Sequence, residues 1–161
     1  MRSTLVFLAF AAICTMIAFI GAKATTPEIP HWYARINKPS WTPPRLAFPI
    51  VWPILYAMIA VAGWRLWEAP SSDLRTAALI AFAVQLALNA VWSPVFFAAH
   101  RILAGLVVIV LLDAAIVATI WMSWDVQRWT SFLLLPYLAW TIFATALNAR
   151  IWTLNRDAVA V

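Results

Sequence analysis

Five apolar blocks constrain this chain most strongly, because each is long enough to cross a lipid bilayer. A helix needs about 20 apolar residues to span a hydrocarbon core of about 30 Å. Only 11% of the 161 residues are charged, whereas a soluble domain carries roughly a quarter. We therefore predict an all-α integral membrane protein, a five-transmembrane-helix bundle that forms a single domain over residues 1–161. The expected helices cover residues 4–22, 46–67, 75–99, 102–124 and 129–151, and a loop covers residues 23–45.

The first block has two readings, a signal peptide or a retained helix. It ends at Ala22-Lys23-Ala24, which has the small-x-small form of a cleavage site. The apolar run is longer than the core of about 7–15 residues that signal peptides have. We interpret it as a retained transmembrane helix. Because the later connections are short, consecutive helices are expected to be antiparallel neighbours.

The basic residues flank the apolar blocks and predict the orientation in the membrane. The N-terminus and the second and fourth loops carry Arg2, Arg65, Arg75 and Arg128. The first and third loops and the C-terminal end carry Lys23, Arg35, Lys38, Arg45, Arg101, Arg150 and Arg156. The positive-inside rule places the richer end in the cytoplasm and the N-terminus outside. Since lipid headgroups account for the formal net charge of +5, we expect no nucleic-acid partner.

The segment between the first two blocks is rich in proline and tryptophan. Its prolines fix φ, remove backbone donors and bias the preceding residues to extended geometry. The loop is therefore expected to be stiff and non-helical, and to hold Trp32 and Trp41 in place. Beyond it, Phe48, Trp52 and Tyr56 recur every four residues and are expected to share one face of the second helix.

The third block places two amides and two aromatic rings on one stripe, Gln85, Asn89, Trp92 and Phe96. An amide that faces lipid would be unsatisfied and cost a few kcal/mol, so both are expected to face the bundle interior. There they either bond another helix, which is the commoner use of such residues, or present donors and acceptors to a ligand. The stripe alone leaves both readings open.

The last block has a similar face, formed by Tyr137, Trp140, Ala144 and Asn148. Interior aromatic rings beside a few polar groups describe a flat, apolar pocket with an orienting amide. Such a site suits a planar aromatic or macrocyclic ligand better than an ion or a sugar.

Asp113 lies near the middle of the fourth block, where an acid costs roughly 2.5–3.5 kcal/mol. It is either functional, as a proton site or ligand partner, or it is bonded across a helix interface or a dimer contact. Small residues on the fourth and fifth blocks would permit a homodimer. No catalytic or metal-binding set is recognisable. The two histidines, His31 and His100, fall in loops where simple solvation is expected, and Cys14 has no partner for a disulfide.

Four motifs occur in order along the chain. They are WY at 32–33 with NKPSWTPP at 37–44, FPIVW at 48–52, QLALNAVWSPVFF at 85–97, and PYLAW at 136–140 closing at LN 147–148. Together they resemble the translocator protein family, also called the tryptophan-rich sensory protein or peripheral benzodiazepine receptor family (TspO/MBR). The resemblance extends over nearly the whole chain and points to a bacterial member, in an inner or an outer membrane.

The resemblance implies a five-helix bundle, often dimeric, whose pocket opens toward a first loop that acts as a lid. Family members bind protoporphyrin IX, haem and isoquinoline carboxamide or benzodiazepine-like drugs, with no required cofactor. By this resemblance Trp52 and Asn89 would hydrogen-bond the ligand, and Ala144 would occupy a position where side-chain size matters. Trp32 and Trp140 would flank a porphyrin and take part in its photo-oxidation. Animal members also bind cholesterol, through a segment whose tyrosine is missing here between residues 147 and 150.

Together with the interior stripes, the resemblance leads to one main hypothesis. The protein is a membrane receptor or sensor that binds tetrapyrroles and benzodiazepine-type or isoquinoline carboxamide ligands in a pocket within the bundle, with a role in tetrapyrrole transport or regulation. The alternative is a light-dependent porphyrin-degrading enzyme. A true transporter is a third possibility. The chain shows no pair of inverted repeats, which argues against the usual alternating-access mechanism. The expected ligand-binding residues are Trp32, Trp41, Phe48, Trp52, Tyr56, Gln85, Asn89, Trp92, Phe96, Trp140, Ala144 and Asn148.

Overall fold

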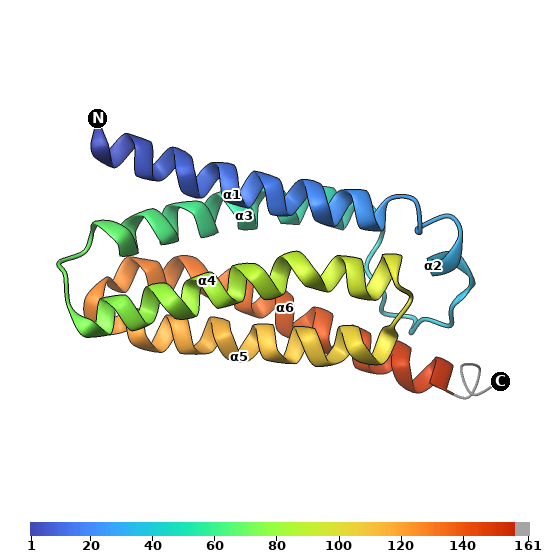
Figure 1. Cartoon of the computed structure of the whole chain (residues 1–161). Helices are drawn as coiled ribbons and strands as arrows, with labels where there is room; N and C mark the ends of the chain where they lie inside the picture. The colour runs from blue at the N-terminus through green and yellow to red at the C-terminus, as the bar shows by residue number, and fades with distance from the viewer. Residues whose placement is uncertain (157–161) are drawn as a thin grey trace.

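A computed structural model describes residues 1–156, and these residues form the predicted five-helix bundle (Figure 1). The long helices are α1 (Arg2–Thr25), α3 (Ala47–Glu68), α4 (Asp73–Ser93), α5 (Ile102–Val126) and α6 (Arg128–Asn155). A one-turn helix, α2 (Trp32–Arg35), lies in the first loop, and a π-helical segment, η1 (Pro94–Ala98), follows α4. The rest of the predicted domain, residues 157–161, lies outside the described part of the chain.

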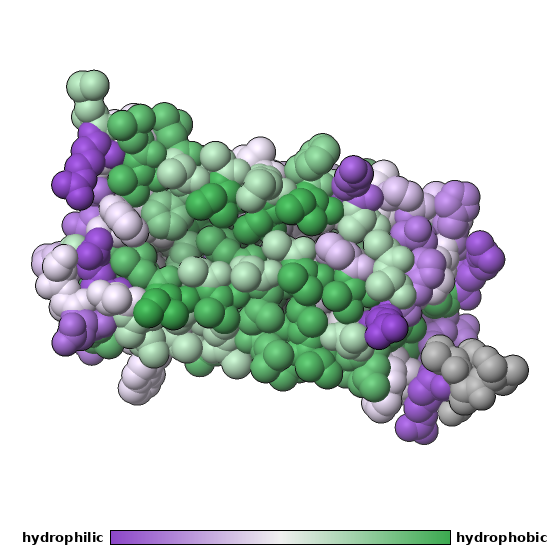
Figure 2. Space-filling view, in the orientation of Figure 1, coloured by the Kyte–Doolittle hydropathy of each residue, from purple (hydrophilic) through white to green (hydrophobic). Residues whose placement is uncertain are grey.

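Consecutive long helices run antiparallel, so the connections gather at the two ends of the bundle (Figure 1). The N-terminus, the α3–α4 connection and the α5–α6 turn lie at what we call the N-terminal end. The first loop, the η1–α5 turn and the C-terminal part of α6 lie at the lid end. Hydrophobic residues cover the visible middle of the molecule and hydrophilic residues gather at both ends (Figure 2). This pattern is expected of a multi-pass membrane protein, and which end faces the cytoplasm stays a prediction.

The bundle is packed unevenly around its axis. Large, fully buried side chains come from α3 to α6, namely Ile59, Leu66, Phe82, Ile109, Leu112, Ile116, Leu134 and Tyr137. In contrast, α1 buries only Cys14 and Ile17 among its described residues. The most apolar stretch of α1 is 11% buried, whereas that of α5 is 39% buried. Helix α1 therefore packs on the outside of the bundle, against α3 and α4.

Helices α1 and α3 approach each other closely at Gly63. A Cβ atom at this position would lie 2.6 Å from Phe10 Cδ1 and 2.8 Å from Phe82 Cζ, which is closer than real side chains pack. The rings of Phe10 and Phe82 meet edge to face with their centroids 5.8 Å apart. The next residue, Trp64, donates from Nε1 to Ser3 Oγ at 3.0 Å. The missing side chain thus lets α1 dock near the N-terminal end.

The third predicted helix changes geometry before its expected end at residue 99. Pro94 has no amide hydrogen to donate to the preceding turn. The chain continues as a π-helical turn, in which Ala99 N donates to Pro94 O at 2.9 Å. Because a π turn holds more residues than an α turn, the side chains after Pro94 are rotated away from the stripe that a regular helix predicts. Both Phe96 and Phe97 are buried.

The first loop, residues 26–46, is the lid, and it is bonded to the last helix. Asn155 Oδ1 accepts from Asn37 N, and Asn155 Nδ2 donates to Asn37 O, both at 2.9 Å. Lys38 Nζ donates to the carbonyl groups of Tyr33 at 2.5 Å and Ile36 at 2.8 Å. The prediction of a non-helical loop over residues 23–45 is wrong for residues 23–25, which belong to α1, and for the single turn α2. Helix α6 also continues past the predicted end at residue 151, because Asn155 has these loop partners.

Candidate functional site

A cavity of about 830 Å³ lies between α1 and α3 and extends under the lid. This volume is within the range of about 300–1,000 Å³ typical of small-molecule sites. The lining residues are mainly apolar, and they come from the five long helices and the lid. The predicted site residues that line it are Phe48, Trp52, Tyr56, Asn89, Trp92, Trp140 and Ala144. Thr15 on α1 and Ala57 on α3 line it but are also exposed, so the cavity opens toward the surrounding membrane.

Asn89 is the polar centre of the cavity wall. Its Oδ1 accepts from Tyr56 Oη at 2.8 Å, and its Nδ2 donates to Tyr137 Oη at 2.6 Å. Each tyrosine hydroxyl can donate or accept, so in this arrangement Tyr56 donates and Tyr137 accepts. One N–H and one lone pair of the amide remain for a further partner. Asn89 therefore combines the two readings of the sequence, since it links three helices and also lines the cavity.

Aromatic rings form the rest of the wall near the lid. Trp52 stacks on Tyr56 with centroids 5.2 Å apart and planes inclined by 29°. On the same face of α3, Phe48 meets Trp140 of α6 edge to face at 5.8 Å. The α3 rings recur every four residues and share one face of the helix, as the sequence predicts. Together these rings give flat apolar surfaces around one amide.

Trp32 takes part in a different group, which we call the lid cluster and which consists of Trp32, Tyr33, Phe96 and His100. Trp32 stacks on His100 at 4.5 Å with planes 13° apart, and it meets Phe96 at 5.6 Å. His100 Nε2 also lies 2.8 Å from Glu28 Oε2. The expectation that His100 is simply solvated is therefore wrong. Its φ of 56° places it in the left-handed region, which makes the tight turn from η1 into α5 possible.

The remaining predicted site residues lie outside the cavity wall. Trp41 is 46% exposed and packs on Phe143 at 5.7 Å. Gln85 is fully buried, with no hydrogen-bond partner for its amide among the described residues. Asn148 Nδ2 donates to Ile102 O at 2.9 Å, which is a structural bond between α6 and the start of α5.

Phe96 and Trp32 also lie outside the wall, in the lid cluster. Phe97, which the sequence analysis did not select, lines the cavity in place of Phe96. The reason is the π-helical turn at Pro94, which shifts the inward face by one residue. Trp92 joins the two groups, since it lines the cavity and stacks on Phe96 at 5.4 Å.

Arg45 is a site residue that the sequence analysis missed. It is the only charged residue among the described residues that line the cavity, and it lies at the lid. A guanidinium at the mouth of an apolar cavity attracts a carboxylate. The available signal was its position directly after the proline pair of the second motif, three residues before Phe48.

Asp113 lies between α5 and α6 and does not line the cavity. Thr145 Oγ1 donates to Asp113 Oδ2 at 2.7 Å, so the structure supplies the interhelical bond that was one of the two open readings. Within residues 1–156, no three His, Cys, Asp or Glu side chains come together in a way that could hold a metal ion.

The bundle and its lidded aromatic cavity define a multi-pass membrane protein with an internal small-molecule-sized site. Residues 10–153 match the TspO/MBR family. The chain is 41% identical over 140 residues to the tryptophan-rich protein TspO of Archaeoglobus fulgidus, which covers 86% of this chain and 90% of that protein.

It is also 37% identical over 149 residues to the tryptophan-rich sensory protein of Cereibacter sphaeroides, over 91% of this chain and 92% of that protein. It is 35% identical over 139 residues to the translocator protein of Homo sapiens, over 85% of this chain and 82% of that protein. The chain belongs to the TspO/MBR family, as its motifs predict, and a role as a membrane sensor or receptor follows from this membership.

Proposed function

We propose that the protein is a membrane receptor for tetrapyrroles such as protoporphyrin IX and haem, and for other planar aromatic molecules. The observation that supports this most directly is the bonded amide of Asn89 among the aromatic rings of a cavity of about 830 Å³. Flat rings offer stacking surfaces to a flat ligand. The amide offers one further donor and one further acceptor beside its two tyrosine bonds.

Arg45 adds a charge criterion to this proposal, because it favours a ligand that carries a negative charge near the lid. Protoporphyrin IX and haem carry propionate carboxylates on one edge of an otherwise apolar macrocycle. In the proposed complex the macrocycle lies between the aromatic walls, and its carboxylates point toward the lid and Arg45. The membrane opening beside α1 gives such a ligand an entry path from the bilayer.

The test is a binding titration of the purified protein with protoporphyrin IX, followed by quenching of tryptophan fluorescence. Trp52→Ala is expected to weaken binding about tenfold, the loss expected for one stacking aromatic partner and its apolar area. Trp41→Ala, which removes an exposed tryptophan outside the cavity wall, is the matched control and is expected to bind normally. Equal affinity of the two variants would contradict the proposed site.

The charge criterion has its own test. Arg45→Gln is expected to weaken protoporphyrin IX binding about three- to fivefold, because an exposed ion pair contributes little. Binding of the dimethyl ester, which has no carboxylate, is expected to be unchanged by the same substitution. If Arg45→Gln weakens the ester equally, Arg45 acts through lid structure rather than through charge.

The second candidate function is light-dependent breakdown of bound porphyrin. Trp140 favours it, because this ring lines the cavity and meets Phe48 directly. Trp32, the other expected participant, lies in the lid cluster, so the proposal gives the role of electron donor to Trp140. Illumination of the complex while the porphyrin absorption is recorded tests it. Degradation by Trp140→Phe at the wild-type rate would exclude this role.

A further inference from the structure

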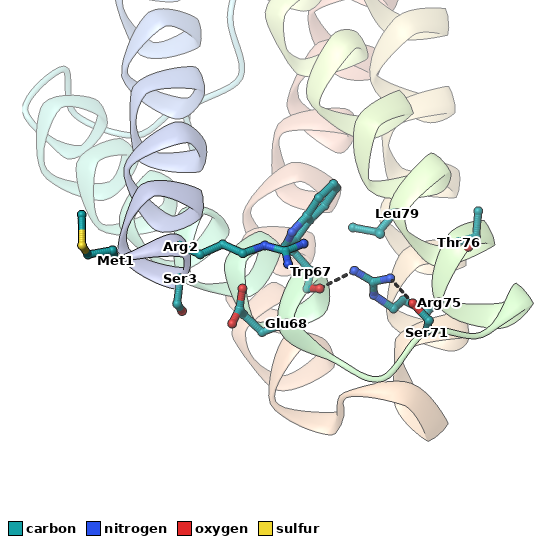
Figure 3. Close-up of a pocket in the computed structure, with 9 residues that line it drawn as sticks. All are labelled: Met1, Arg2, Ser3, Trp67, Glu68, Ser71, Arg75, Thr76 and Leu79. Atoms are coloured by element: carbon teal, nitrogen blue, oxygen red, sulfur yellow. Dashed lines mark hydrogen bonds between the residues drawn. The ribbon is translucent and has the colours of Figure 1, made fainter.

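A second cavity, of about 810 Å³, lies at the N-terminal end of the bundle (Figure 3). It forms where α1 begins, α3 ends and α4 begins. None of its lining residues lines the aromatic cavity. Whereas the aromatic cavity has one charged residue in its wall, this one has three, Arg2, Glu68 and Arg75. This cavity is therefore suited to a charged ligand.

Arg75 is held in place at one side of this cavity. Its Nε donates to Leu66 O at 3.3 Å, its Nη1 donates to Ser71 Oγ at 3.2 Å, and its Nη2 donates to Trp67 O. The guanidinium also lies over the Trp67 ring, 5.6 Å from the centroid. These contacts use three of the five N–H groups of a guanidinium, so an oriented cation with two further donors remains.

Arg2 and Glu68 lie on the other side of the cavity, and the Arg2 side chain extends toward Trp67 (Figure 3). Both side chains are exposed, and no ion pair joins them among the described residues. The cavity therefore presents two guanidinium groups and one carboxylate in separate positions. A ligand that carries one anionic and one cationic group can contact all three.

The position of the cavity indicates where such a ligand comes from. Trp67 is 43% exposed at the end of a membrane-spanning helix, which is where tryptophan meets the headgroup region of a bilayer. Leu5 and Leu74, on the neighbouring helix starts, are also exposed and apolar. A charged cavity with apolar side chains beside it, at the level of the headgroups, fits a lipid with a polar head and acyl chains.

We propose that this cavity binds the headgroup of phosphatidylethanolamine from the surrounding leaflet. The phosphate lies between Arg2 and Arg75, because a guanidinium binds phosphate oxygens through paired N–H bonds. The ammonium donates to the carboxylate of Glu68. A choline headgroup has no N–H to donate, and an anionic headgroup without an amine leaves Glu68 unpaired, so ethanolamine is the preferred class.

The experiment is a lipid titration of the delipidated full chain in detergent, read by native mass spectrometry. Phosphatidylethanolamine, phosphatidylcholine and phosphatidylglycerol with identical acyl chains are compared. The ethanolamine lipid is expected to bind about fivefold more tightly than the choline lipid, as one charge-assisted hydrogen bond at a hydrated site predicts. Arg2→Gln is expected to weaken it by about the same factor, and Glu68→Gln is expected to abolish the preference over choline.

Arg128→Gln is the matched control, because Arg128 lies at the same end of the bundle, over the Trp124 ring and outside the cavity. It is expected to bind all three lipids as the wild type does. Arg2 and Glu68 are both exposed, so their replacement leaves the fold intact, and the melting temperature of each variant verifies this. Arg75 is left unchanged, since it bonds the last carbonyl groups of α3.

Two results would overturn the proposal. Equal binding of the three lipids, or an equal loss in Arg2→Gln and Arg128→Gln, would mean a general attraction of headgroups to a basic end. Displacement of the lipid by water-soluble glycerophosphoethanolamine at the same concentration would assign the site to a soluble phosphate compound instead.

Discussion

Two neighbouring regions of this molecule use the same kinds of side chain for different purposes. In the lid cluster, the rings of Trp32, Phe96 and His100 pack on one another and fill the space between the lid and the η1–α5 turn. In the cavity wall, the rings of Trp52 and Trp140 border an open volume. Composition alone does not distinguish the two regions, because both are rich in aromatic residues beside one polar group.

The difference lies in what the polar groups bond. In the lid cluster, His100 pairs with Glu28, which fastens the lid. In the cavity wall, Asn89 bonds two tyrosines and keeps donor and acceptor capacity for a further partner. Substitutions that loosen the lid are therefore expected to lower stability more than ligand affinity. Substitutions in the wall are expected to lower affinity for the proposed ligand. Four predictions test this separation.

The largest expected effect is on stability, from Asn155→Ala. This change removes the side chain that bonds Asn37 N, Asn37 O and Ile151 O. At about 1 kcal/mol for each bond the loss is about 3 kcal/mol, which lowers the melting temperature by about 6–12 °C. Asn37→Ala is the control, because the Asn37 side chain contributes only one long bond, 3.4 Å, to Leu154 O. Equal melting temperatures of the two variants would contradict the expectation that the Asn155 side chain contributes more stability than the Asn37 side chain.

The second effect is on affinity, from Asn89→Leu. It removes the proposed ligand contact and leaves the hydroxyls of Tyr56 and Tyr137 without their shared partner. Affinity for protoporphyrin IX is expected to fall about 10–30-fold. Gln85→Leu, which removes a buried amide one turn away and outside the wall, is expected to bind normally. Because Gln85 has no described partner, this control is also expected to be neutral or slightly stabilising.

The third effect comes from Tyr137→Phe. Tyr137 is fully buried and does not line the cavity, so it can act on a ligand only through the orientation of Asn89. Without the hydroxyl, the amide of Asn89 loses one of its two bonds, and affinity is expected to fall about three- to fivefold. Tyr33→Phe makes the same chemical change in the lid cluster. If Tyr137→Phe and Tyr33→Phe bind protoporphyrin IX equally well, the orientation of the Asn89 amide does not depend on Tyr137.

The smallest effect comes from His100→Asn. Asparagine tolerates the left-handed conformation of His100, so this variant removes the ring and the pair with Glu28 while it keeps the turn. The melting temperature is expected to fall by about 2–4 °C, since a stacked aromatic pair contributes about 1 kcal/mol. Affinity is expected to change less than twofold. A larger loss of affinity would mean that the lid cluster and the cavity wall act together.

The fold could be predicted from the sequence because the five blocks match the thickness of a bilayer. The observed helix boundaries differ from the predicted ones at particular residues. The missing amide hydrogen of Pro94 produced a π-helical turn that no apolar pattern reports. Helix α6 continues to Asn155, whose side chain bonds Asn37 in the first loop. This partner is 118 positions away in the sequence, so the local pattern does not indicate it.

The cavity wall was predicted less evenly. The four-residue spacing of Phe48, Trp52 and Tyr56 placed all three rings on the wall, because a regular helix preserves periodicity. Periodicity failed for Phe96, which lies beyond the π-helical turn. Periodicity cannot predict the position of a loop residue such as Trp32, which stacks on His100 in the turn from η1 to α5. Whether any of these residues binds a ligand stays a prediction.

The bond between Asn37 and Asn155 also orders events during synthesis. The two residues are 118 positions apart, and Asn155 leaves the ribosome after the five apolar blocks. The pairing of Glu28 with His100 can form before the last helix is made, whereas the bond between Asn37 and Asn155 must wait for that helix. Until then the lid has its contacts with η1 and His100 but lacks its connection to α6. A chain that ends before Asn155 would keep the five apolar blocks and remain without this connection.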